Sequence, residues 1–142
     1  MAKGLVGSQL LRMDISNNAV NPFGAESLLL YLKQASSLQM LLIYNCGLGP
    51  LGVAKIAEGL RGTPQLRALS IGRNRMENAG ILSIAAELKH VPLLEDLFVY
   101  QNTLKEEGLR ELFKELRANC KNITSLDICD NFVRGAATTE LS

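Results

Sequence analysis

Residues 66–76 read LRALSIGRNRM, and this stretch decides the fold because the chain repeats its pattern at a nearly constant interval. Similar segments occupy residues 10–20, 38–48, 94–104 and 123–133. All five follow the pattern L-x-x-L-x-L-x-x-N/C-x-L. The alternation of apolar and other residues at its centre predicts a short strand whose apolar side chains face a core.

The ninth position of the pattern is always asparagine or cysteine. These residues, spaced by 28, 28, 28 and 29 positions, are Asn18, Cys46, Asn74, Asn102 and Asn131. A small polar group or thiol in the turn after a strand can satisfy neighbouring backbone groups by hydrogen bonding. We therefore expect this side chain to lie inside the turn.

A glycine follows six residues after the first four of these positions, and apolar residues follow each glycine by four and eight. The glycines are Gly24, Gly52, Gly80 and Gly108. The apolar pairs are Leu28 and Leu32, Ile56 and Leu60, Ile84 and Leu88, and Leu112 and Leu116. Their spacing predicts one face of a helix of about 10 to 12 residues. The glycine indicates either close backbone packing or a positive φ at the start of the helix.

A strand, turn and helix of this size cannot bury its apolar face alone, so repeats of this kind stack side by side. The sequence therefore predicts an α/β leucine-rich-repeat solenoid, with a parallel sheet on the concave face and helices on the convex face. We expect one domain over residues 1–142, with repeats near 10–37, 38–65, 66–93, 94–122 and 123–142. The fifth repeat reaches Gly135 only four residues after Asn131, which suggests part of a longer array, or uncapped ends that associate with each other.

Composition narrows the classes of partner. Fifteen Lys and Arg against fourteen Asp and Glu leave a net charge of +1, which gives no electrostatic case for nucleic acid or an anionic membrane. Three cysteines without a C-x-x-C pair indicate reduced thiols. The start lacks the features of a secretory signal, and the apolar runs are too short to span a membrane. We expect a cytoplasmic protein that binds another protein or a small molecule.

The residue between the two apolar positions of each L-x-L triplet should point away from the core. That row is Asp14, Leu42, Ser70, Phe98 and Asp127, and the row two residues earlier is Arg12, Met40, Ala68, Asp96 and Ser125. Tyr44 and Tyr100 should lie just beyond the strands. Leu42, Tyr44, Phe98 and Tyr100 are large groups that the core does not require, so we predict a protein-binding patch. The alternative is that they are isolated exposed apolar residues, which are common.

Little in the sequence suggests chemistry on a small molecule. Residues 47–52, GLGPLG, match the dinucleotide motif G-x-G-x-x-G, but the repeat pattern itself requires Leu48 and Gly52. His90 has no cysteine or carboxylate at metal-ligand spacing, and we expect it to be a solvated loop residue. Cys120 and Cys129 have no patterned partner. We therefore expect no metal, no cofactor and no enzymatic activity of the chain itself.

Two segments contain more than the repeat explains: residues 44–50, YNCGLGP, and residues 72–78, GRNRMEN. Together they resemble the signature of Ran GTPase-activating proteins, which are built from similar leucine-rich repeats. The resemblance implies a protein that binds the small GTPase Ran in its GTP form at the solenoid rim and promotes GTP hydrolysis in nucleocytoplasmic transport. It also implies a location in the cytoplasm or at the nuclear envelope. In that family an asparagine orders Ran's own catalytic glutamine, and the matching residue here is Asn45.

The residues around this position admit two interpretations. Asn45 should lie on the exposed turn at the carboxyl end of a strand, with Arg73 as its lateral neighbour. Arg73 and Arg75 either contact Ran or a phosphate, or pair with Glu77 or with turn carbonyls. Asn45 itself either acts on the partner or stabilises the turn. The corresponding alternative function is a non-catalytic leucine-rich-repeat scaffold that binds another protein.

Overall fold

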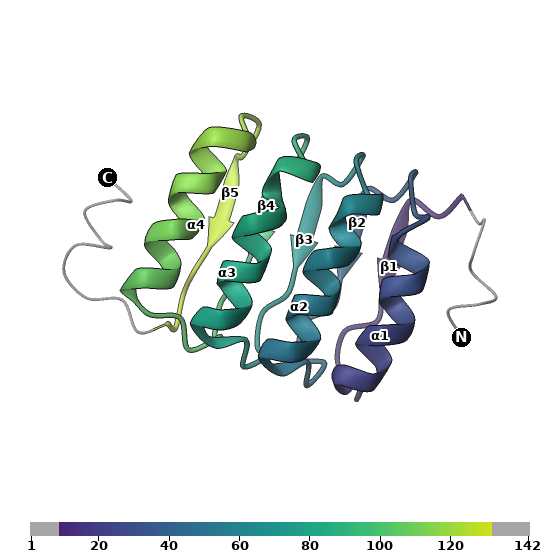
Figure 1. Ribbon diagram of the computed structural model, residues 1–142, viewed down its shortest axis with the longest axis horizontal. Coiled ribbons are helices and arrows are strands. Elements are labelled where there is room, and N and C mark those ends of the chain that lie inside the picture. The colour runs from purple at the N-terminus through teal and green to yellow at the C-terminus, as the bar shows by residue number, and fades with distance from the viewer. Residues whose placement is uncertain (1–8, 132–142) are drawn as a thin grey trace.

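The computed structural model of the chain describes residues 9–131, in which five short strands alternate with four helices (Figure 1). The strands are β1 (Arg12–Asp14), β2 (Met40–Leu42), β3 (Ala68–Ser70), β4 (Asp96–Phe98) and β5 (Ser125–Asp127). The helices are α1 (Asn21–Leu32), α2 (Gly49–Gly59), α3 (Glu77–Glu87) and α4 (Glu106–Asn119). Single 3₁₀ turns, η2 (Leu60–Gly62) and η3 (Leu88–His90), follow α2 and α3.

The strands form one parallel sheet in the order of the sequence, β1 to β5. The register follows the interval of the sequence pattern, since Met13 pairs with Leu41 and Leu41 pairs with Leu69. The last step, from Leu97 to Leu126, is longer by a single position, as the sequence pattern requires. The prediction of an α/β fold with a parallel sheet is therefore confirmed, and equivalent positions of successive segments are lateral neighbours.

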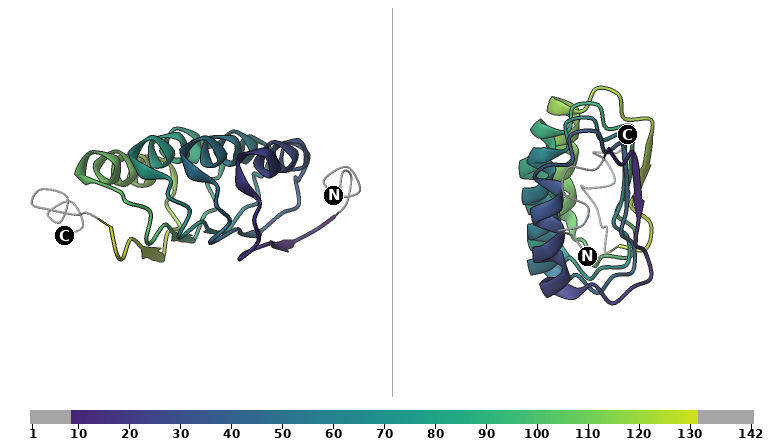
Figure 2. Two further views of the ribbon diagram at one scale, coloured as in Figure 1. Left: turned by 90° about the horizontal axis from the view of Figure 1, so that it is seen from below. Right: turned by 90° about the vertical axis from the view of Figure 1, so that its right-hand side faces the viewer.

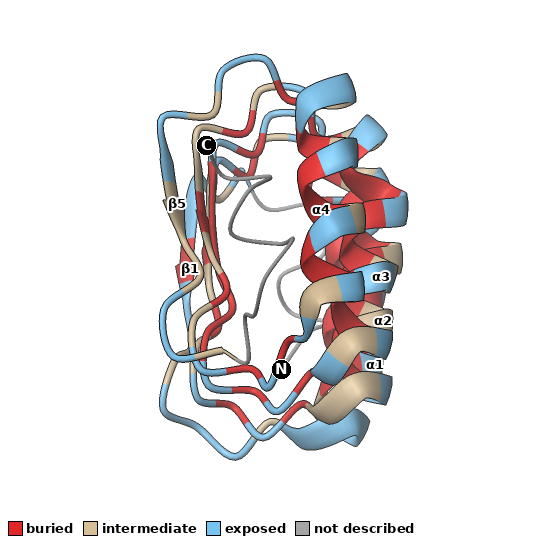
Figure 3. Cartoon of the chain, turned by 90° about the vertical axis from the view of Figure 1, so that its left-hand side faces the viewer, coloured by how far each residue is buried: buried red, intermediate tan, exposed pale blue. Residues whose placement is uncertain are grey.

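The helices form a second layer that covers one face of the sheet, and the core lies between the layers (Figures 2 and 3). The central residues of β1 to β4, Met13, Leu41, Leu69 and Leu97, are buried. All eight residues predicted to form the core-facing side of the helices are also buried. The other face of the sheet, which we call the open face, is not covered by a helix of the described part of the chain.

The sequence left open whether the regularly spaced glycines allow close packing or a positive φ, and the structure shows close packing. A Cβ built on Gly80 would lie 2.5 Å from Cβ of Met76, and one on Gly52 would lie 2.9 Å from Cβ of Leu48. Neither glycine has a positive φ. Any larger residue would push the first turn of the helix away from the turn before it.

The predicted lengths of the helices agree with the observed 12, 11, 11 and 14 residues to within a turn. The predicted domain bounds and the end of the fifth repeat, including Val133 and Gly135, lie outside the described residues. Between residues 9 and 131, no helix is both long and apolar enough to cross a membrane.

Candidate functional site at the rim of the sheet

The turns that leave the carboxyl ends of the strands form one edge of the molecule. We call this edge the rim; it comprises residues 15–20, 43–48, 71–76, 99–104 and 128–131. Its backbone alternates in sign of φ: in one turn Asn45, Gly47 and Gly49 have φ of 54°, 65° and 64°, while Cys46 and Leu48 between them do not have positive φ. In the next turn, Arg73 and Arg75 have φ of 51° and 52°.

The alternation aims successive backbone N–H groups at a single point inside the turn. The N–H groups of Cys46 and Leu48 both donate to Oδ1 of Asn74, at 2.9 and 3.3 Å. Its Nδ2 donates in turn to three carbonyl oxygens, those of Ile43, Ile71 and Gly72. Asn74 is fully buried, and Asn102 makes the same set of contacts one repeat later. The prediction that the ninth position lies inside the turn is confirmed.

Cys46 is the exception in this row. Its thiol donates to the carbonyl oxygens of Ile15 and Tyr44, at 3.3 and 3.4 Å. Val20 corresponds to Leu48 of the next turn, whose N–H donates to the amide oxygen of Asn74. Because cysteine has no amide oxygen, the N–H of Val20 donates to the backbone oxygen of Asn18, at 2.9 Å. Burial raises the pKa of the Cys46 thiol, which keeps its proton available for donation. The ladder of asparagines is therefore interrupted between the first and second turns.

The outer side of the same turns carries the residues that the family resemblance singled out. A shallow hollow of about 370 Å³ is lined by Asn45, Gly47 and Gly49 from one turn and by Arg73, Asn74 and Arg75 from the next. The predicted lateral contact between the turns of Asn45 and Arg73 is confirmed by the backbone bond from Asn45 N to Gly72 O, at 2.9 Å. These residues come from two repeats and lie around one depression.

The Asn45 side chain is exposed but not free. Its Nδ2 donates to Oδ1 of Asn17, the equivalent residue of the previous turn, at 2.8 Å. Asn45 Oδ1 accepts no hydrogen bond from residues 9–131. One end of the amide is thus held by the neighbouring turn, and the other faces solvent beside the hollow.

The alternative that Arg73 or Arg75 pairs with Glu77 is wrong. Among the described residues, neither guanidinium group lies within 4 Å of a carboxylate, and neither bonds a turn carbonyl. Glu77 lines a different hollow, with Asn78 and Lys105, from the one that Arg73 and Arg75 share. Both guanidinium groups remain open to solvent or to a partner.

Tyr44 and Tyr100 come together although two repeats separate them. Their ring centroids are 6.2 Å apart with an interplanar angle of 44°, within the range of favourable aromatic contacts. The residue between them in the row is Gly72, and a Cβ there would lie 2.6 Å from the Tyr100 ring. The Tyr100 ring therefore leans into the space that a side chain at position 72 would fill. Burial raises the pKa of Tyr100, and nearby Ser70 and Arg73 oppose the rise.

Leu42 and Phe98 lie half-buried on the open face, each at the last residue of its strand. Ser70 stands between them in the row and is buried, as is Ala68 in the next row. The sequence predicts the direction of these rows but not the burial of their two small central residues. The described apolar patch consists of two pairs, Leu42 with Phe98 and Tyr44 with Tyr100, that flank Ser70 and Gly72.

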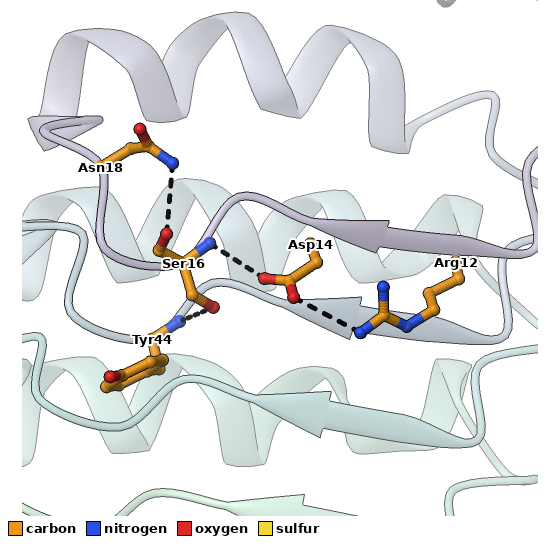
Figure 4. A network of polar contacts seen from close by, with 5 residues as sticks. All are labelled: Arg12, Asp14, Ser16, Asn18 and Tyr44. Atoms are coloured by element: carbon orange, nitrogen blue, oxygen red, sulfur yellow. Dashed lines mark hydrogen bonds and ion pairs between the residues drawn. The ribbon is translucent and has the colours of Figure 1, made fainter.

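A polar network ties the patch to the edge strand β1 (Figure 4). Ser16 Oγ accepts a hydrogen bond from the backbone N–H of Tyr44 at 3.1 Å, and the N–H of Ser16 donates to Asp14 at 3.1 Å. That backbone hydrogen bond is the main reason why the pKa of Asp14 is lowered. Arg12 lies 3.3 Å from the same carboxylate. These groups position Tyr44 rather than offering a reactive site.

The described part of the chain contains no cluster of three His, Cys, Asp or Glu side chains that could bind a metal ion.

His90 is not the solvated loop residue that the sequence predicts. It is the last residue of η3 and is half-buried, and its Nε2 lies 3.5 Å from Glu87. Arg61 binds the same carboxylate at 2.7 and 3.0 Å. Burial raises the pKa of Cys120 to about 11, which makes this thiol a poor nucleophile.

Two exposed residues near the rim were missed by the sequence interpretation. Phe23 and Leu51 occupy equivalent positions in the first turns of α1 and α2 and are 87% and 74% exposed. The signal was available, because the repeat places Phe23 and Leu51 in one column with Ala79 and Glu107.

Comparisons with known proteins give a fold relative and no family. No protein-family model matches the sequence, and no curated protein matches it. Among solved structures, the chain is similar to "Leiomodin-1 Actin-Binding Site 2 (ABS2)", with a TM-score of 0.77 and 15% sequence identity over 99% of this chain and 80% of that one. A likeness at this identity describes the fold alone.

Proposed function

We propose that the chain is a leucine-rich-repeat solenoid that binds a protein partner at its rim, and that this partner is the small GTPase Ran in its GTP form. The chain then promotes hydrolysis of GTP by Ran, in the cytoplasm or at the nuclear envelope, without being an enzyme itself. The contact surface comprises Leu42, Tyr44, Phe98 and Tyr100 together with Arg73 and Arg75. Asn45 is the residue that stimulates hydrolysis.

The observation that supports this proposal is the shared hollow. Asn45 and the two unpaired arginines belong to different repeats, yet they line one depression on an exposed edge. The two sequence segments that resemble the Ran activators thus meet in space. A side chain that orders a partner's catalytic group must be exposed and held in one place. Asn45 meets both conditions through its bond to Asn17.

A second candidate function is a scaffold that binds a protein without affecting GTP hydrolysis. The hydrogen bond between Asn45 and Asn17 favours it, because this bond gives Asn45 a structural role. Equivalent residues in all five turns have positive φ: Asn17, Asn45, Arg73, Gln101 and Asp130. Asparagine tolerates this conformation better than most residues. The turn and the bond to Asn17 are therefore a sufficient structural reason for asparagine at position 45. The apolar patch supports protein binding under either function.

Single-turnover hydrolysis by GTP-loaded Ran separates the two functions. Asn45→Gly removes the amide and keeps a residue that accepts positive φ, so the turn is not strained. Asn17→Gly tests the positioning of Asn45, since it removes the hydrogen-bond partner but leaves the Asn45 amide in place. For an activator we expect acceleration that Asn45→Gly reduces by about a hundredfold or more, and that Asn17→Gly reduces by less, because the amide is loosened but still present.

Binding is measured in parallel with Ran that carries a non-hydrolysable GTP analogue. An activator should keep its affinity in the Asn45→Gly variant, because the apolar patch and the arginines are unchanged. A folded chain that accelerates nothing, with or without binding Ran, would leave the scaffold as the function.

A further inference from the structure

The first turns of α1 and α2 present two large apolar side chains to solvent. Phe23 and Leu51 are 87% and 74% exposed and occupy the same position of successive repeats. The two helix starts are in contact, because a Cβ on Gly52 would lie 3.6 Å from Cα of Pro22. Phe23 and Leu51 therefore belong to one surface rather than to separate places.

The fold does not require apolar residues at these positions. The equivalent residues in α3 and α4 are Ala79 and Glu107, both exposed, and these helices pack with the same geometry. Single exposed apolar residues are common on protein surfaces. A phenylalanine and a leucine on adjacent repeats are instead the kind of paired anchor that protein interfaces bury.

The neighbouring hollow supplies positive charge without a counter-charge. Most cations of the described chain lie within 4 Å of a carboxylate: Arg12, Lys33, Lys55, Arg61, Arg67, Arg110 and Lys114. Arg73 and Arg75 do not. In residues 9–131 the backbone N–H groups of Gly47 and Arg75 also donate to no protein acceptor. Guanidinium and free N–H donors together suit carboxylate oxygens.

The basic part lies on the rim, and the apolar part adjoins it at the starts of α2 and α1. Helix α2 begins at Gly49, which lines the hollow together with Arg75. Leu51 follows two residues later, and Phe23 lies beyond it on α1. The surface thus runs from two cations through Leu51 to Phe23.

We propose that this surface binds an extended segment of a partner protein in which apolar side chains stand next to carboxylates. The apolar side chains pack on Leu51 and Phe23, and the carboxylates bind Arg73 and Arg75. The inference rests on the proposal that the rim binds a protein, and it applies whether or not that protein is a GTPase. Charge complementarity decides the choice of occupant, because the two arginines have no acidic partner among the described residues.

The test selects peptides from a random library displayed on phage, using the whole chain as the target. Selected peptides are then titrated by fluorescence anisotropy against two double variants. Phe23→Ser with Leu51→Ser removes the apolar part. Arg73→Asn with Arg75→Asn removes the charge, and asparagine accepts the positive φ at both positions. Circular dichroism verifies that each variant is folded.

Matched controls alter the same residue types elsewhere on the surface. Leu30→Ser with Leu82→Ser changes two exposed leucines of α1 and α3, and Lys89→Ser with Lys121→Ser removes two exposed cations. We expect selected peptides to combine carboxylates with apolar residues and to lose about tenfold in affinity or more in both test variants. The controls should change affinity less than about twofold, and added salt should weaken binding to the wild type more than to the arginine variant.

Three outcomes would overturn the inference: no enriched peptide, enriched peptides without carboxylates, or peptides that bind both test variants as well as the wild type. Cosedimentation with phosphatidylserine-containing vesicles that depends on the same four residues, without peptide binding, would assign the surface to a membrane instead. Failure of the GTPase proposal appears separately, as absent stimulation of Ran by a chain that still binds these peptides.

Discussion

Asn45 and Asn74 lie in adjacent turns of the rim, and Asn74 is the residue after Arg73, the equivalent of Asn45. One of the two asparagines is exposed and the other is buried. Asn74 is fully buried and makes five hydrogen bonds to backbone groups of two repeats. Asn45 is exposed and makes one side-chain hydrogen bond, to another exposed asparagine. Both sit in a turn whose φ alternates in sign, so a shift of one position reverses the side to which a side chain points.

The difference shows which asparagine the fold depends on. Removing a buried side chain leaves the backbone groups that have no second partner unsatisfied and out of reach of water. Removing an exposed side chain leaves groups that water can satisfy. The inner side of each turn is therefore required for folding, and the outer side is available for binding.

The largest expected effect is on the inner side. Asn74→Ala leaves the N–H groups of Cys46 and Leu48 and the carbonyl group of Ile43 without a partner. The other two carbonyl oxygens, of Ile71 and Gly72, keep the bonds from Asn102 Nδ2 and Asn45 N. We expect the free energy of unfolding to fall by about 3 to 5 kcal/mol. Urea denaturation followed by circular dichroism measures the change. A loss below about 1 kcal/mol would mean that water replaces the amide and that the turn is not closed as described.

A smaller effect, of opposite sign, is expected where the ladder is interrupted. Cys46→Asn supplies an amide oxygen for the N–H of Val20, and donors for the carbonyls of Ile15 and Tyr44. We expect a gain of about 1 kcal/mol in the free energy of unfolding, seen as a higher midpoint in urea. Cys46→Ser is the control of similar size, and it should not stabilise, because a hydroxyl cannot reproduce both ends of the amide.

The opposite ends of the repeats hold an ion pair that makes stability depend on pH. Hydrogen bonding from Arg61 lowers the pKa of Glu87. The ion pair therefore stabilises the folded state fully at pH values above the pKa of Glu in the unfolded chain. This stabilisation is lost as the pH falls through the lower pKa that Glu87 has in the folded state. Arg61 is more than half exposed, and solvent screening limits the effect to less than about 1 kcal/mol. The free energies of unfolding of wild type and Glu87→Gln should differ near neutral pH and converge once the pH falls below the lowered pKa of Glu87. Parallel curves would contradict the ion pair's contribution.

The smallest change in stability is expected at Asn45. Asn45→Gly removes one exposed hydrogen bond and keeps the left-handed backbone without strain, so the free energy of unfolding should change by less than about 0.5 kcal/mol. The same denaturation experiment measures it. A loss as large as that of Asn74→Ala would show that Asn45 serves the fold and would remove the reason to assign it to a partner.

Sequence reasoning was most accurate where a position repeats. The regular interval of the pattern correctly predicts the strands, the inward-facing ninth residue and the apolar pairs of the helices. It does so because equivalent positions have similar neighbours on both sides and are therefore buried in the same way. It was least accurate where unlike residues meet. The burial of Ala68 and Ser70, the contact of His90 with Glu87 and the absence of an ion pair between Arg73 and Glu77 depend on the size and direction of particular neighbours.

The sequence by itself thus determined the parallel arrangement of strands, the helix layer, and the identity of the residues that face the rim, since spacing alone assigns a residue to a side. Only the tertiary structure decided which of those residues act together. Tyr100 approaches Tyr44 because Gly72 leaves space between them. Asn45, Arg73 and Arg75 surround one hollow, and Phe23 adjoins Leu51, because the parallel register of the strands brings positions 28 residues apart into lateral contact.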